Sequence, residues 1–172
     1  AIGVTCAKLG EAEVMADAGV RDLLIANPLV GRLKLARLIE LRRRADPIVV
    51  VDHPDQVHAL SDAATAGNVS IRTMIEIDIG MNRCGVAPGQ PAVPLAQQVS
   101  DSPGLEFVGI MGWEGHLVTV SDPSEKALRI AAAVGQLRDT RSELEQAGFT
   151  CPIVSAGGTG SYQITARLGV AT

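Results

Sequence analysis

Short apolar runs rich in β-branched residues alternate along this chain with longer stretches rich in Ala and Leu. The short runs are apolar at successive positions, as strands buried on both faces of a parallel sheet are, and the longer stretches show helical patterns. We expect strands at residues 2–7, 22–26, 48–51, 72–78, 107–111 and 152–155. We expect helices at residues 11–18, 32–44, 54–66, 92–100 and 124–147, and a further helix that begins near Ser161.

Strand and helix units in strict alternation, with short connections, predict parallel strands joined by crossover helices. Two α/β architectures fit this pattern, a doubly wound sheet and a (β/α)8 barrel, and the spacing alone favours neither. The chain offers six units where a closed barrel has eight. In both architectures ligands bind at the carboxyl ends of the strands, so the residues that follow each strand are the functional candidates.

Several residues mark the expected ends of the helices. Asp122 is placed to cap the long helix at residues 124–147. Asp52 is placed to cap the helix at residues 54–66. Gly19, Gly67 and Gly148 each follow a helical stretch, at the position where a left-handed residue usually ends a helix. No linker or low-complexity segment divides the chain, which we expect to form a single domain over residues 1–172.

Composition narrows the class of protein. The chain has 172 residues, 47% of them hydrophobic and 20% charged, which is typical of a globular domain with a sizeable core. A net charge of −4 without a basic block argues against nucleic acid as a partner, and 2% aromatic residues argue against base stacking. No apolar run is long enough to span a bilayer. Three separated cysteines without a CxxC pair fit a reducing cytoplasm, with no zinc site and no disulfide framework.

The two ends of the sequence are unusual for a whole gene product. The chain starts on Ala1 inside an apolar run, without Met, and it stops at Thr172 without a polar tail. No signal peptide accounts for the start. We therefore expect this sequence to be a piece of a longer protein.

A glycine-rich segment, SAGGTGS at residues 155–161, lies between an expected strand and an expected helix. Adjacent glycines let backbone N–H groups approach an oxyanion, and the hydroxyls of Ser155, Thr159 and Ser161 add donors. A helix N-terminus there would also favour negative charge. The segment is neither a P-loop nor a complete GxGxxG. A flexible turn without a ligand is the alternative interpretation.

Two further strand ends carry candidate chemistry. The loop DIGMNRCGV at residues 78–86 holds one guanidinium, Arg83, which is suited either to a carboxylate or ring nitrogen of a ligand or to a structural ion pair with Asp78 or Glu76. The segment GWEGH at residues 112–116 combines the chain's only Trp, Trp113, with a carboxylate and His116. His116 is a candidate acid or base, or else a histidine satisfied by ordinary hydrogen bonds.

Lys8 follows the first expected strand, where an amine could form a Schiff base. Glu11 and Glu13 follow closely, so an ordinary ion pair explains Lys8 at least as well.

Taken together, these segments resemble the fold-type III pyridoxal-phosphate (PLP) enzymes that have an alanine-racemase-like N-terminal barrel. The nearest resemblance is to the D-threonine aldolase and D-serine dehydratase group, the metal-activated pyridoxal enzymes. The matching stretches are GVTCAK (3–8), EAE (11–13), DLLIANPLVG (22–31), EIDIGMNRCGV (76–86), GWEGH (112–116) and SAGGTGSY (155–162). The resemblance favours the (β/α)8 barrel and implies that residues 1–172 are the PLP-binding barrel domain in part.

The resemblance also implies roles for particular residues. Trp113 and His116 would line the pocket as catalytic residues, although Tyr is common where Trp113 stands. The implied cofactor-binding residues are Arg83, Ser155, Gly157, Gly158, Thr159 and Tyr162, with the phosphate on Gly157, Gly158 and Thr159. The Schiff-base lysine of such enzymes lies upstream of this chain, and the ligands of their activating metal lie in a C-terminal β domain beyond Thr172. No metal ligand is expected within the chain.

The expected activity of the intact protein is that of a PLP-dependent lyase, which cleaves a D-β-hydroxy amino acid such as D-threonine to glycine and an aldehyde. Dehydration of D-serine or D-hydroxyaspartate and racemisation are the alternatives within the same fold, and a non-catalytic PLP-binding fragment is the alternative of another class. The implied cofactors are PLP and a divalent metal (Mn, Mg or Zn). We expect a cytoplasmic protein that forms a homo-oligomer, a dimer, because an open barrel exposes apolar sheet edges.

Overall fold

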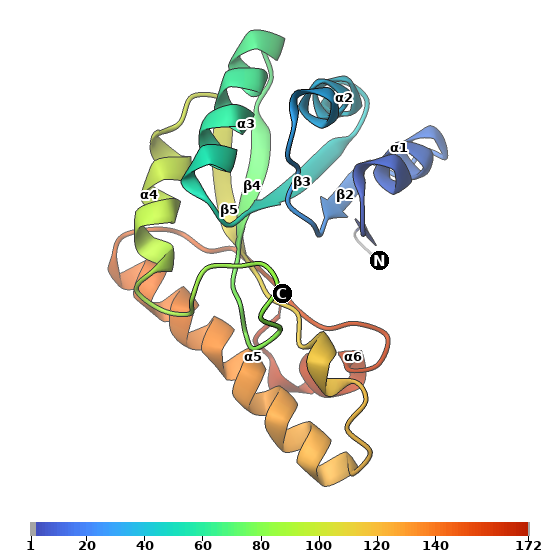
Figure 1. Ribbon diagram of the computed structural model, residues 1–172, viewed down its shortest axis with the longest axis vertical. Helices are drawn as coiled ribbons and strands as arrows, with labels where there is room; N and C mark the ends of the chain where they lie inside the picture. Colours follow the sequence, from blue (N-terminus) through green and yellow to red (C-terminus); the bar gives the residue numbers. More distant parts are fainter. Residues whose placement is uncertain (1–2, 172) are drawn as a thin grey trace. The chain divides into compact units, whose positions relative to one another are not determined.

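The computed structural model describes residues 3–171 and contains the predicted alternation of strands and helices (Figure 1). The strands are β1 (Val4–Cys6), β2 (Asp22–Ile25), β3 (Asp46–Val51), β4 (Ile71–Glu76), β5 (Leu105–Met111) and β6 (Ile153–Ser155). The α-helices are α1 (Leu9–Asp17), α2 (Arg32–Arg42), α3 (Pro54–Gly67), α4 (Ala92–Asp101), α5 (Pro123–Gln146) and α6 (Tyr162–Thr165). Short 3₁₀ helices, η1 (Gly115–Leu117) and η2 (Ala166–Leu168), complete the described elements. Each expected strand is found with ends shifted by a few residues, and Ile2 of the first lies outside the described residues.

The order of the strands separates the two architectures that the sequence left open. The six strands neighbour one another in chain order, from β1 to β6 without a reversal. A doubly wound sheet has a point at which the strand order reverses, whereas a (β/α) barrel adds each strand beside the one before it. The pairs β1–β2, β2–β3 and β5–β6 are parallel, with Val4 opposite Leu23 and Ile110 opposite Val154. The chain therefore has six consecutive units of the barrel type.

The described chain divides into two compact units. The first contains the chain up to Met74 together with Gln97–Phe107, and the second contains Ile75–Ala96 together with the chain from Val108 onward. The core of the first unit includes Leu23, Leu38 and Ile71, all fully buried. That of the second includes Ile77, Ile110 and Leu137, which are equally buried. No helix in the described part of the chain is long and apolar enough to cross a membrane.

Two helix starts show how the caps are arranged. Asp122 caps α5 as expected, because its Oδ1 accepts a hydrogen bond from the Glu125 N–H at 2.7 Å. The prediction that Asp52 caps α3 is wrong. His53 is the cap, with an extended backbone and its Nδ1 accepting from the Asp55 N–H at 3.2 Å. Asp52 instead accepts from the side-chain amide of Gln56 at 2.7 Å.

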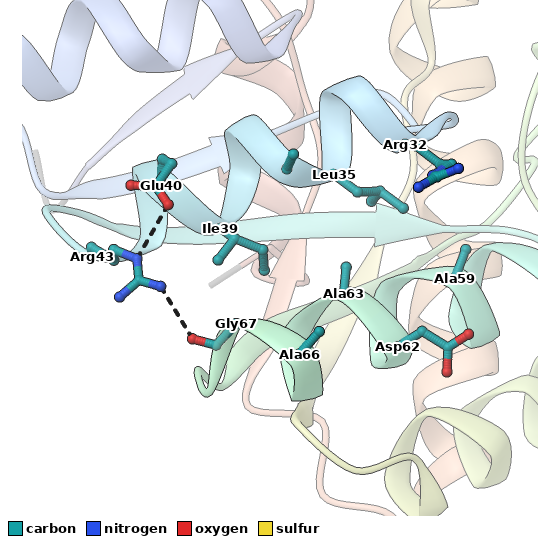
Figure 2. A pocket seen from close by; sticks show the side chains of 11 residues that line it. Arg32, Leu35, Ile39, Glu40, Arg43, Ala59, Asp62, Ala63, Ala66 and Gly67 are labelled. Atoms are coloured by element: carbon teal, nitrogen blue, oxygen red, sulfur yellow. Dashed lines mark hydrogen bonds and ion pairs between the residues drawn. The ribbon is translucent and has the colours of Figure 1, made fainter.

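The expected left-handed glycines are confirmed at two helix ends and wrong at the third. Gly19 has a φ of +90° and Gly148 a φ of +93°. At the end of α3 it is Asn68, with a φ of +49°, that takes the left-handed position, and Gly67 is the last residue of the helix. Gly67 is small for a different reason, since a Cβ built on it would lie 2.5 Å from Cγ2 of Ile39 on the facing helix α2 (Figure 2).

Charged side chains tie together the amino ends of three strands in the first unit. Nη2 of Arg72, on β4, lies 2.7 Å from Oδ1 of Asp22 and 2.8 Å from Oδ2 of Asp46. The same nitrogen donates to the main-chain carbonyl of Asp46 at 2.7 Å. Asp22 and Asp46 are the first residues of β2 and β3. This end of a barrel is the one where side chains serve stability rather than chemistry.

Candidate functional site

The three segments singled out in the sequence for Arg83, for Trp113 and His116, and for the glycine-rich turn come together in the second unit. They follow strands β4, β5 and β6, which are neighbours in the sheet. Hydrogen bonds continue past the strand ends, from the Ile77 N–H to the Met111 carbonyl at 2.7 Å and from the Gly112 N–H to the Ser155 carbonyl at 3.0 Å. The three loops therefore leave the sheet side by side at its carboxyl edge. We call them the arginine loop (residues 77–91), the tryptophan loop (112–122) and the glycine loop (156–161).

Trp113 is fixed by two glycines. A Cβ built on Gly115 would lie 2.4–2.6 Å from three carbons of the six-membered ring, and one built on Gly158 would lie 2.8 Å from the indole Nε1. No side chain fits at either position without moving the indole. Trp113 is half-buried, so one part of its ring packs against the glycine loop while another part stays accessible.

Arg83 lies over the indole of Trp113, with its guanidinium carbon 5.4 Å from the ring centroid. This distance is within the range of a cation–π contact. Asp78 shapes the turn that presents Arg83, because its Oδ1 accepts from the N–H groups of Gly80 and Asn82, each at 3.0 Å. Within the described residues, Arg83 thus rests on Trp113 and forms no ion pair with Asp78. Its exposed guanidinium is suited to an anionic or aromatic ligand.

The glycine loop is held by bonds from its first two glycines. Gly157 has a φ of +90° and donates its N–H to Oε2 of Glu114 at 3.3 Å. Gly158 donates its N–H to the Ser161 hydroxyl at 3.0 Å, and its carbonyl accepts from the N–H groups of Ser161 and Tyr162. Both N–H groups that the sequence suggested for a phosphate are therefore engaged within the protein.

Free hydrogen-bond donors of the glycine loop lie at the two residues that follow Gly158. The N–H groups of Thr159 and Gly160, and the Thr159 hydroxyl, have no hydrogen-bond partner in the part of the chain that the structure describes, and both residues are exposed. Two successive N–H groups with a nearby hydroxyl make a concavity suited to an oxyanion. The free donors of this loop are thus centred on Thr159.

The helix expected to begin near Ser161 is confirmed, and it is short. α6 has four residues and passes directly into η2, which is followed by Gly169 with a φ of +65°. A single turn adds few aligned peptide dipoles. The donors that this loop offers are therefore local N–H and hydroxyl groups, with little contribution from a helix dipole.

Glu114 occupies a position to which the sequence assigned no role. Its side chain is completely buried, and its Oε1 accepts from the Thr165 hydroxyl at 2.7 Å while its Oε2 accepts from the Gly157 N–H. Thr165 is 2% exposed. Both contacts join segments far apart in the sequence, and the only local signal was a carboxylate inside the GWEGH motif.

His116 lies in η1, with its side chain exposed and its ring against the arginine loop. A Cβ built on Gly80, whose φ is +112°, would lie 2.9 Å from the imidazole Nε2. The glycine therefore leaves room for the ring. The imidazole is therefore exposed beside the loop that carries Arg83.

The remaining predicted site residues lie at the margins of this group. Ser155 ends β6 and uses its carbonyl to hold the tryptophan loop through Gly112. Tyr162 is 56% exposed, and its hydroxyl accepts from the side-chain amide of Gln163 at 3.3 Å. The structure thus brings Arg83, Trp113, His116 and the glycine loop together and leaves the phenol of Tyr162 open to solvent.

Two hollows lie in the first unit. One, of about 320 Å³, is lined by residues that follow β1 and β2 and by the cations Lys8, Lys34 and Arg37. Nζ of Lys8 lies 3.9 Å from Oε1 of Glu11, in the ordinary ion pair that the sequence offered as its alternative role.

The other hollow is a groove of about 700 Å³ between α2 and α3. Figure 2 shows the alanine side chains of α3 that line it, Ala59, Ala63 and Ala66. It also shows Arg43, which interacts with both Glu40 and the Gly67 carbonyl. In residues 3–171, no three His, Cys, Asp or Glu side chains are grouped as metal ligands.

Comparison with known proteins gives a consistent set of relatives. Residues 1–169 match the model of the family described as alanine racemase, N-terminal domain. The chain is 36% identical to a D-threonine aldolase of Arthrobacter sp over 99% of its own length and 45% of that protein. It is 32% identical to a 3-hydroxy-D-aspartate aldolase of Paracoccus denitrificans (strain Pd 1222), over 98% of this chain and 44% of that one.

A solved structure agrees with these relatives. The crystal structure of D-threonine aldolase from Filomicrobium marinum superposes with a TM-score of 0.96 and 43% identity, over 99% of this chain and 46% of that chain. The chain therefore spans less than half of the length of each of these relatives.

Proposed function

Because this chain belongs to the alanine racemase N-terminal domain family, we propose that it forms part of a PLP-dependent lyase that acts on D-β-hydroxy amino acids. The proposed reaction is retro-aldol cleavage, by which D-threonine would give glycine and acetaldehyde. The relatives whose names give them as aldolases support this choice. The observation that carries the proposal is the meeting of Arg83, Trp113, His116 and the glycine loop at one edge of the sheet.

The residues present fit the phosphate end of such a cofactor. At Gly158 and Gly160 a Cβ would press against Trp113 and Val118, and Gly157 has a φ of +90°, which disfavours any side chain. The N–H groups of Thr159 and Gly160 have no hydrogen-bond partner among the described residues. We propose that these N–H groups, with the hydroxyls of Thr159 and Ser155, hold the phosphate.

The proposed ring end lies at Arg83. The guanidinium, held on the face of Trp113, would meet the pyridine ring or the carboxylate of the substrate and fix its orientation. PLP, when bound, supplies an electron sink for the negative charge that develops at Cα of the amino acid.

The proposed chemistry needs proton transfer at the substrate. The Cα–Cβ bond breaks as the β-hydroxyl loses its proton to give the aldehyde, and Cα takes up a proton to give glycine. His116 is the candidate among the described residues near Arg83, because its imidazole is exposed and its Nε2 lies at the arginine loop. The resemblance places the Schiff-base lysine and the ligands of the divalent metal, Mn, Mg or Zn, in segments that this chain does not contain.

The proposal is tested by supplying the purified full protein with PLP and Mn²⁺ and, in separate reactions, with D-threonine, L-threonine or D-alanine. Glycine and acetaldehyde in equal amounts, with no products from L-threonine, would support retro-aldol cleavage. Formation of 2-oxobutanoate would replace it with dehydration, and exchange between D- and L-alanine would replace it with racemisation. PLP binding without turnover of any of these amino acids would contradict the proposal and favour a non-catalytic PLP-binding protein.

We also propose a homo-oligomer, a dimer, that works in the cytoplasm on small D-amino acids. Within the described residues β1 lies at one edge of the sheet, and if the chain exists as this fragment, that edge is a surface on which a second copy can pair. Light scattering of the purified protein measures the assembly, and a clean monomer would count against it.

A further inference from the structure

A buried carboxylate under a loop that is proposed to hold a phosphate needs a physical explanation. Glu114 is 0% exposed and lies next to Gly157, where its negative charge opposes the approach of a second anion. A charge in this position is tolerated only if hydrogen bonds satisfy it. From its contacts we infer that Glu114 is a positioning residue, which fixes the glycine loop and α6 in the arrangement that leaves the Thr159 and Gly160 N–H groups free. This inference rests on the proposed function.

The two carboxylate oxygens hold two different elements. Oε1 accepts from the Thr165 hydroxyl at 2.7 Å, at the end of α6, and Oε2 accepts from the Gly157 N–H at 3.3 Å, at the start of the glycine loop. Residues 158–164 lie between these two points, so this one buried side chain fixes the segment on both sides. A Cβ built on Gly157 would lie 3.6 Å from Cβ of Thr165, which shows how closely the three residues pack.

Neighbouring residues of the tryptophan loop act on neighbouring glycines. Trp113 packs against Gly158, and Glu114 bonds to Gly157. The Trp113 contact is steric and limits how closely the glycine loop approaches the indole. The hydrogen bonds of Glu114 are directional and fix the orientation of the loop. Loss of the carboxylate therefore frees the orientation of the loop while its packing on Trp113 remains.

Glu114 acts through the loop and not on the phosphate itself. It takes up the N–H of Gly157, so that an incoming phosphate finds its donors at Thr159 and Gly160. Glu114 therefore contributes to phosphate binding by holding the glycine loop in position, and this role does not depend on its charge. In E114Q the amide oxygen can still accept from Gly157 while the amide nitrogen donates to the Thr165 hydroxyl.

The test compares E114A with E114Q, and T165V with T165S, in the full protein. One readout is hydrogen exchange of the amides of residues 157–165 without ligand. The other is the dissociation constant of pyridoxamine 5′-phosphate by equilibrium dialysis, since this probe carries the phosphate but no aldehyde that reacts with surface lysines. E114A is expected to exchange faster in this segment and to bind the probe about tenfold more weakly, as the loss of such hydrogen bonds implies.

E114Q and T165S keep both hydrogen bonds and are expected to stay within about threefold of the wild type, while T165V shifts toward E114A. If E114A fails to fold, T165V against T165S decides the same question. Unchanged exchange and affinity in E114A or T165V, or equal losses in E114Q and E114A, would overturn the inference. Faster exchange in E114A together with no binding of the probe to the wild type would support the positioning role and count against the proposed function instead.

Discussion

Gly158 lies directly against the indole of Trp113, so that a methyl group on this glycine would come within 2.8 Å of Nε1. Real Cβ atoms do not approach other atoms so closely, and either the indole or the glycine loop must move to admit one. Because Arg83 rests over the face of the same indole, a change at Gly158 is expected to reach Arg83 as well.

G158A is therefore expected to weaken binding of pyridoxamine 5′-phosphate by about tenfold and to shift the fluorescence of Trp113, the only tryptophan in this sequence. W113F removes the five-membered ring that collides with the new methyl group, so G158A should cost much less in a W113F background. Binding constants of the four proteins in a double-mutant cycle measure this coupling. Additive effects would show that the contact does not transmit the change.

A second prediction concerns the amino ends of the strands. R72A leaves the carboxylates of Asp22 and Asp46 facing each other without their shared cation, and it should lower the free energy of unfolding by about 1–3 kcal/mol. All three close contacts of Arg72 are made by the single nitrogen Nη2, which one ammonium can partly replace. R72K should therefore lose less than R72A in urea unfolding. Equal midpoints for R72A and the wild type would contradict this account.

Local patterns were enough to place the elements of this fold but not to arrange them. Each strand and helix has signals within its own residues, such as the apolar run of β3 and the Asp122 cap of α5. The strand order, which separates a barrel from a doubly wound sheet, depends on pairing between distant segments. Only the family resemblance pointed to the barrel before the structure did.

The candidate site followed the same division. Arg83, Trp113 and His116 were identifiable because each follows a strand, and ligands gather at strand ends. The role of Glu114 was missed because it depends on Gly157 and Thr165, which no spacing near residue 114 indicates. Gly67 was misinterpreted for a related reason. A glycine is needed at this position because Ile39 packs against it from another helix, and not because its own helix ends there.

Gly67 and Gly135 form a matched pair for testing this last point. Both have helical backbones, where Ala is favoured over Gly by about 1 kcal/mol. The nearest atom to a Cβ on Gly135 would be Nη2 of Arg138 at 3.8 Å, so G135A is expected to stabilise the protein by about 1 kcal/mol. A Cβ on Gly67 would lie 2.5 Å from Ile39, so G67A should destabilise it, and I39A should relieve the clash. Stabilisation of both variants alike would show that Ile39 adapts without cost.

Burial of Cys151 predicts how stability changes at alkaline pH. Cys151 is 2% exposed, and its burial raises the pKa of the thiol from 9.0 to about 11. Because the pKa of the folded state lies above that of the unfolded chain, the thiol contributes fully to stability below about pH 9, and the contribution is lost as the pH rises toward 11. The linked loss in the free energy of unfolding is about 2 kcal/mol.

The test is urea unfolding from pH 7 to 11 under a phosphine reductant, for the wild type and for C151A. C151A is expected to be less stable at pH 7, because it leaves a small cavity in the core. The difference between the two proteins should then shrink as the pH rises, because only the wild type loses the contribution of a buried neutral thiol. A difference that stays constant across this range would show that Cys151 ionises in the folded protein as readily as in the unfolded chain.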